Sequence, residues 1–125
     1  MDDDKLSRLL KRFGAAAGSH HEALEEMNEE RANAHFLMID RLYKCILNQG
    51  PAGKAGLLDL VDSDAGVVAG MAAVYALQEH PERCLAVLRK LAAEPGLLGF
   101  RASVAVERWE TGTWVHPGKN SNDIN

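Results

Sequence analysis

The chain has 125 residues, of which 46% are hydrophobic and 6% aromatic, and its formal net charge is −4. This length fits one domain, and the modest, evenly spread charge excludes the basic surface that captures a phosphate backbone. We therefore expect no nucleic-acid partner. Cys45 and Cys84 are isolated and belong to no Cys-x-x-Cys pair, so we expect both to be buried, reduced thiols.

The N-terminal residues give no sign of a targeting or membrane segment. Three aspartates follow Met1, where a signal peptide would have a cationic end and an apolar run. The longest uncharged apolar stretch is also far shorter than the roughly 20 residues that a membrane span needs. We expect a cytoplasmic protein that does not associate with a membrane.

Apolar residues at helical spacing predict a first helix that starts at the aspartates and continues through the Gly/Ala-rich segment 14–18. Its apolar stripe consists of Leu6, Leu9, Leu10, Phe13 and Ala17. Ser19 and Glu22 have the spacing of a capping box, which would start a new helix at that point. The alternatives are one long helix or a kink near Ser19, and the apolar residues Ala23, Leu24 and Met27 favour the long helix.

A second long helix is predicted to begin after Asn28, a suitable N-cap that is followed by two glutamates. Gly50 and Pro51 end it, because glycine accepts positive φ and proline cannot continue a helix. One face of this helix is apolar and consists of Ala32, Phe36, Ile39, Tyr43 and Ile46.

The core of the protein is expected to be organised around the helix at 67–77, which has no charged residue on any face. A short helix at about 52–60 precedes it, and the acidic loop of Asp62, Ser63 and Asp64 is predicted to cap it. Pro81 and Pro95 separate two further helices, the last of which stops at Thr111 and Gly112. The polar segment 113–125 is predicted to be a flexible tail.

The segment around the central helix occurs twice with a period of 30 residues. Shifting the chain by 30 places aligns Val61 with Leu91, Asp64 with Glu94 and Gly66 with Gly96. The pattern predicts a repeated unit of helix, acidic loop and helix. We expect full burial at three positions and at their repeat mates: Val68, Ala72, Val74, Leu98, Ala102 and Val104.

This unit resembles the HEAT-like (armadillo-type) α-helical repeats of small bacterial proteins. The resemblance covers 52–112 and rests on the Leu-Leu-x-Leu and acidic-loop pattern, on 92–100, and on the Glu-Arg-Trp at 107–109. It departs at Val67 and Val68, where such repeats usually have Val-Arg. The resemblance implies an all-α superhelix of about six helices, in which two long helices (1–50) cap two HEAT-like units (51–112) of a single domain, 1–112. It implies no particular activity.

No motif for catalysis or cofactor binding is present. His21 and Glu25 share one helical face with further glutamates nearby, but neither Glu-x-x-His nor His-Glu-x-x-His occurs. Nucleophile elbows and phosphate-binding glycine loops are also missing. We expect no metal, no cofactor and no catalytic residue.

Aromatic and charged residues gather towards the end of the last helix. Trp and Arg are enriched among interface residues that dominate binding energy, so five residues are candidates for partner binding: Arg101, Glu107, Arg108, Trp109 and Trp114. The alternative is that Trp109 is core and Trp114 covers the helix end.

The sequence favours a binding module that docks another protein as an adaptor, a regulator or a toxin-neutralising partner. An enzyme or enzyme accessory with a cryptic site near His21 and Glu25 is the alternative. A third hypothesis, DNA binding, is disfavoured by the acidic balance. The oligomeric state is open, and a homo-oligomer is compatible with the sequence.

Overall fold

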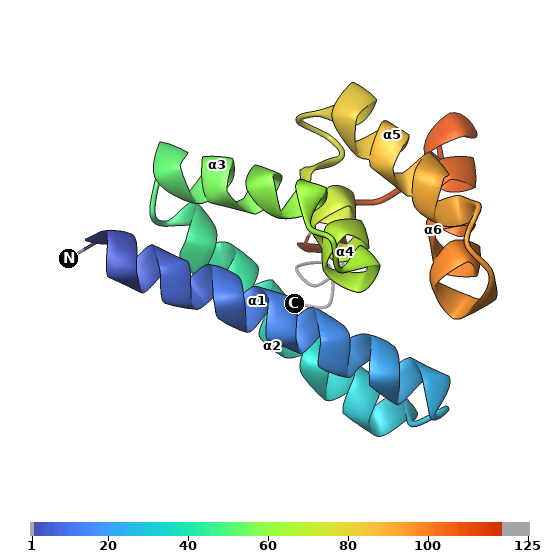
Figure 1. Cartoon of the computed structure of the whole chain (residues 1–125), viewed down its shortest axis with the longest axis horizontal. Coiled ribbons are helices and arrows are strands. Elements are labelled where there is room, and N and C mark those ends of the chain that lie inside the picture. Colours follow the sequence, from blue (N-terminus) through green and yellow to red (C-terminus); the bar gives the residue numbers. More distant parts are fainter. Residues whose placement is uncertain (1, 119–125) are drawn as a thin grey trace. The chain divides into compact units, whose positions relative to one another are not determined.

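The computed structural model describes residues 2–118, with side chains from residue 4 onward. The fold is all-α, as predicted, and the described residues contain six α-helices and no strand (Figure 1). The chain divides into two compact units, Met1–Leu60 and Val61–Asn125. None of the helices in the described part of the chain combines the length and apolar character needed to cross a membrane.

The first unit is built on a hairpin of two long helices. Helix α1 (Asp2–Glu25) is continuous, so no kink occurs near Ser19, and α2 (Glu29–Leu47) runs back alongside it (Figure 1). Their contact is made by large and small apolar side chains that are spaced three, four or seven residues apart. Those with no exposed surface are Phe13, Ala17, Ala23, Ile39 and Ile46.

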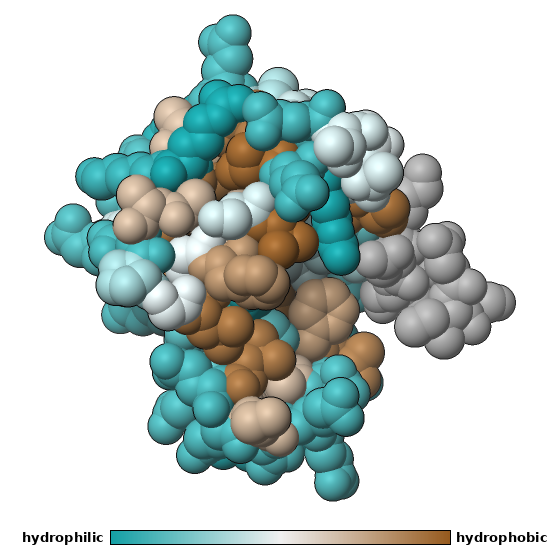
Figure 2. Space-filling model, turned by 90° about the vertical axis from the view of Figure 1, so that its right-hand side faces the viewer, coloured by the Kyte–Doolittle hydropathy of each residue, from teal (hydrophilic) through white to brown (hydrophobic). Residues whose placement is uncertain are grey.

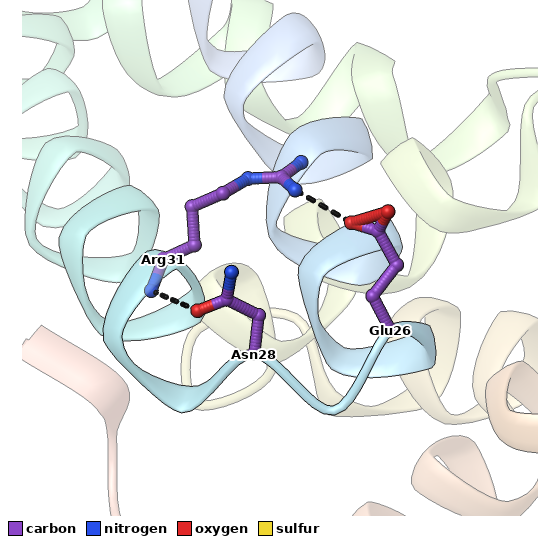
Figure 3. A network of polar contacts seen from close by, with 3 residues as sticks. All are labelled: Glu26, Asn28 and Arg31. Carbon is purple, nitrogen blue, oxygen red and sulfur yellow. Dashed lines mark hydrogen bonds and ion pairs between the residues drawn. The ribbon is translucent and has the colours of Figure 1, made fainter.

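The turn between these helices has an unusual residue. Met27 adopts a φ of 58°, and the amide of Asn28 donates to the carbonyl of Ala23 at 2.9 Å, which is the Schellman pattern that normally places glycine in this conformation. The Asn28 side chain accepts from the Arg31 amide at 3.0 Å, and Arg31 pairs with Glu26 at 2.5 Å (Figure 3). The predicted N-cap at Asn28 is confirmed.

Helix α3 (Pro51–Asp59) completes the first unit by packing on α1 and α2. Gly53 allows this close approach, because a Cβ atom there would lie 1.8 Å from the carbonyl oxygen of Ile46. A short 3₁₀ turn, η1 (Leu60–Asp62), follows. The predicted pairing of 52–60 with 67–77 as a repeat unit stays a prediction.

The second unit consists of α4 (Gly66–Ala76), α5 (Pro81–Ala92) and α6 (Gly96–Glu110). Helices α5 and α6 pack on each other and on α4, and six residues of α4 are buried: Ala69, Met71, Ala72, Ala73, Tyr75 and Ala76. The expected role of this apolar helix as a core element is therefore confirmed for its own unit.

Full burial was predicted correctly for Ala72 and Ala102 and wrongly for the other four repeat positions. Side chains at Val68, Val74, Leu98 and Val104 are half-buried. The buried stripe of α4 instead runs through Ala69, Ala72, Ala73 and Ala76, whose spacing follows the helical period. The 30-residue shift therefore located the helices but did not identify which face of α4 is buried.

Two further predictions are wrong. Cys45 is exposed, whereas Cys84 is buried as expected, because Cys45 lies on the side of α2 away from Ile39 and Ile46. The acidic loop does not cap α4: the N-cap position is Ala65, with no side-chain bond. Ser63 instead accepts from the Ala65 amide at 3.1 Å.

Candidate functional site

The end of α6 carries an aromatic cluster. The rings of Trp109 and Trp114 meet edge to face, with centroids 5.5 Å apart, and Trp114 contacts His116 in the same manner at 5.9 Å. His116 in turn contacts the ring of Tyr75 at 5.6 Å. We call these four residues the aromatic cluster. Edge-to-face contacts of this kind each add about 0.5–1.5 kcal/mol beyond the area they bury.

A sharp reversal of the chain after α6 produces this cluster. Gly112 has a φ of 76°, and the amides of Thr113 and Trp114 both donate to the carbonyl of Arg108, at 2.8 and 3.0 Å. This Schellman end turns the chain back on the helix, so that Trp114, five positions after Trp109 in the chain, contacts its ring. Both tryptophans are half-buried, so that each keeps part of its surface open to solvent.

His116 fastens the returning segment to α4. Its Nε2 lies 3.1 Å from the carbonyl oxygen of Tyr75, and its Nδ1 accepts from the amide of Gly118 at 2.9 Å. Residues 113–118 of the predicted tail therefore contact the helices of the second unit. The rest of that prediction, 119–125, lies outside the described residues.

The five residues predicted to bind a partner do not form one continuous site. Trp109 and Trp114 are in contact, and the exposed side chains of Glu107 and Arg108 lie on the same last turns of α6. Arg101 lies about 12 Å from Trp109 along the axis of α6, towards the N-terminus of the helix. It lines a small cavity of about 90 Å³ together with Val67 and Val74 of α4, and burial lowers the pKa of its guanidinium.

A second hollow of the same unit lies between the two acidic loops. This cleft has a volume of about 620 Å³, and its apolar floor includes Val61, Leu91 and Leu98, while Asp64 and Glu94 stand at its loops. Val61 and Leu91, like Asp64 and Glu94, are repeat mates in the sequence. The 30-residue period therefore indicates which residues line this cleft. The chemical motifs considered in the sequence did not indicate it.

Two ion pairs join α5 to the first acidic loop and to the end of α6. Arg83, at the start of α5, pairs with Asp62 of the first acidic loop, and Arg89 lies 3.6 Å from Glu110 at the end of α6. Both pairs are largely exposed, so each contributes little to stability.

Apolar surface is exposed as well as polar surface, as the brown areas of Figure 2 show. The sequence indicated exposure for none of the large apolar residues that are exposed in the described part of the chain, and Met27 was placed in the apolar stripe of the first helix, because periodicity alone does not tell which apolar residues stay uncovered. They are Met27, Leu37, Met38, Phe100 and Val115.

The histidine and glutamate residues near the end of α1 include a close pair, His21 and Glu25. His21 Nε2 lies 3.7 Å from Glu25 Oε1, the ordinary spacing of residues four apart on a helix. Among the residues that the structure describes, no group of three or more His, Cys, Asp or Glu side chains is arranged to hold a metal ion. The alternative of a cryptic enzymatic site there stays a prediction.

Comparison with known proteins adds no relative: no protein-family model matches the chain, and no curated protein or solved structure matches it at a significant level.

Proposed function

We propose that this chain is a protein-binding module that contacts its partner through the end of α6 and the segment that folds back on it. One observation carries the proposal: Trp109 and Trp114 are held edge to face while both remain partly open to solvent. Tryptophan and arginine are over-represented among the residues that dominate binding energy, and Arg108 is exposed on the same turn.

The geometry of the cluster also suits recognition because it is already ordered. His116 contacts both Trp114 and Tyr75 and so holds Trp114 in place, and a partner would not have to restrict a flexible aromatic side chain. Preorganisation of this kind raises affinity by lowering the entropy lost on binding. The charged neighbours Glu107 and Arg108 would form a polar rim around the rings.

We further propose that the module acts in the bacterial cytoplasm as an adaptor, a regulator or a toxin-neutralising partner. The resemblance of 52–112 to HEAT-like repeats supports this class of role, because helical repeats commonly present extended binding surfaces. The absence of catalytic motifs from the sequence agrees with a binding role.

The test is affinity purification from an extract of the native organism, with quantitative mass spectrometry of the captured proteins. Bait variants are Trp114→Ala and Arg108→Ala. The matched control is Arg8→Ala, which removes an exposed arginine from α1. Circular dichroism of each bait verifies that the helices are intact.

We expect at least one protein to be captured by the wild type and by Arg8→Ala and to be depleted about 30-fold by Trp114→Ala, the effect of a 2 kcal/mol hot spot. A smaller loss is expected for Arg108→Ala. If every captured protein is retained equally by all four baits, the end of α6 is not the binding surface.

A further inference from the structure

Helix α2 has a second face that no helix of the first unit covers. Ile39, Leu42 and Ile46 are buried, and the opposite side is exposed along its whole length. The exposed residues recur at intervals of three and four, so they lie on one side of the helix. We call this set the α2 outer face: Glu30, Ala34, Leu37, Met38, Arg41 and Cys45.

The chemistry of this face changes along the helix. Leu37 and Met38, in the middle, are 51% and 45% exposed, which is unusual for large apolar side chains. An acid, Glu30, lies on the N-terminal side of them and a base, Arg41, on the C-terminal side, about 16 Å apart along the axis. Neither of these two charged residues forms an ion pair within the described part of the chain.

We propose that the α2 outer face binds the same face of a second copy, with the two α2 helices antiparallel around a two-fold axis. In such an isologous contact, residue i of one copy meets residue j of the other, and residue j meets residue i. An acid on one side of the centre and a base on the other therefore form two equivalent Glu30–Arg41 pairs. A parallel arrangement would instead place Glu30 beside Glu30.

The side chains near the centre suit the same arrangement. With Glu30 opposite Arg41, the two-fold axis passes between Ala34 and Leu37. Leu37 of each copy then lies opposite Ala34 of the other, and Met38 lies one residue further from the axis. The small side chain of Ala34 leaves room for the leucine, so that the helix axes can approach to the usual 8–10 Å or so.

Self-complementarity favours a second copy over other occupants. A lipid surface would require a continuous apolar face with basic flanks, but Glu30 interrupts it. A face of six residues is smaller than the roughly 20–30 residues per side of a stable complex. The dimer is therefore weak and forms at high protein concentration. This inference does not depend on the proposed function, which uses α6.

The first experiment measures the dimer dissociation constant of the full chain by sedimentation equilibrium. The variants are Glu30→Arg, Arg41→Glu and the double exchange, with Glu82→Arg as a control for the same change of charge on α5. We expect each single reversal to weaken dimerisation at least tenfold, the double exchange to restore it, and the control to leave it unchanged.

A chain that is monomeric at every concentration, or a double exchange that restores nothing, would overturn the proposal. Leu37→Glu should also abolish the dimer while leaving the helix content by circular dichroism intact, because Leu37 is exposed in the single chain.

The second experiment determines the direction of the two helices by using the cysteines as they are. Cys45 is exposed and Cys84 is buried, and burial raises the pKa of the Cys84 thiol to about 11, so a thiol-reactive spin label attaches to Cys45 alone. The antiparallel arrangement places the two Cys45 backbones about 30 Å apart. A distance of about 10–15 Å between them, as in a parallel pair, would overturn it.

Discussion

The two compact units bury their helices in opposite ways. In the first unit, long helices with one apolar stripe meet through large side chains such as Phe13, Ile39 and Ile46. In the second, the short helix α4 is buried mainly through small residues, including Ala69, Ala72 and Ala73. Large side chains gain stability from the area they bury, whereas small ones permit close packing of backbones. Truncation of a buried side chain should therefore destabilise the first unit most, and enlargement of a buried side chain should destabilise the second.

The largest effect is expected for Phe13→Ala. Phe13 has no exposed surface in the hairpin of α1 and α2, so its loss leaves a cavity and should lower the free energy of unfolding by about 3–5 kcal/mol. A urea titration followed by far-UV circular dichroism measures this change. Leu37→Ala, on the exposed side of α2, is the control and should cost much less. Equal costs would contradict the description of the hairpin core.

The cysteines sharpen the comparison, because the first unit exposes its thiol and the second buries one. Burial raises the pKa of Cys84 from about 9.0 to about 11, while the neighbouring Arg83 lowers it. The folded state therefore holds its proton longer than the unfolded state. The protonated Cys84 thiol therefore contributes fully to the free energy of unfolding below about pH 9. This contribution is lost between about pH 9 and pH 11, at about 1.4 kcal/mol per pH unit.

Urea titrations at several pH values, compared between the wild type and Cys84→Ala, isolate this contribution. The difference in stability between the two proteins should shrink as the pH rises through that window. Cys45→Ser, which removes the exposed thiol and leaves Cys84 in place, is the control. A difference that stays constant up to pH 11 would show that the Cys84 thiol titrates normally.

Enlargement of α4 is expected to have a smaller effect. Ala72→Leu introduces three carbons where no surface is exposed, and such overpacking typically costs about 1–3 kcal/mol. Both tryptophans, Trp109 and Trp114, belong to the second unit, so their fluorescence in urea reports this change directly. The same exchange at the exposed Ala34 should have little effect on the single chain. An unchanged urea midpoint for Ala72→Leu would show that α4 is not part of the core.

The smallest effects are expected at the two Schellman ends. Met27 has a φ of 58° and Gly112 a φ of 76°, a conformation that glycine adopts without strain and other residues do not. Met27→Gly should stabilise the protein by about 0.5–1 kcal/mol and Gly112→Ala should destabilise it by about 1 kcal/mol. Thermal unfolding of the two variants measures both signs. Destabilisation by Met27→Gly would mean that the methionine side chain makes a needed contact.

The site was only partly accessible to sequence reasoning. Composition singled out Trp109 and Trp114, but their contact depends on the reversal at Gly112, and His116 was assigned to the tail because a polar segment carries no periodic signal. Arg101 was grouped with them by proximity in the sequence, yet it lies against α4. Which of these residues come together depends on the direction in which each helix face points. Distance along the sequence does not give that direction.

By itself, the sequence determined that the protein is all-α and where the main breaks between its helices lie. Apolar spacing near 3.6 residues, Asn28 at one helix start and the breakers at Gly50, Pro81 and Gly112 are local signals, and they act through the backbone of a few neighbouring residues. Only the tertiary structure decided which faces are buried: Ala69 more than Val68, and Cys84 but not Cys45. Burial depends on contacts with residues distant in sequence, and these are set when helices pack together.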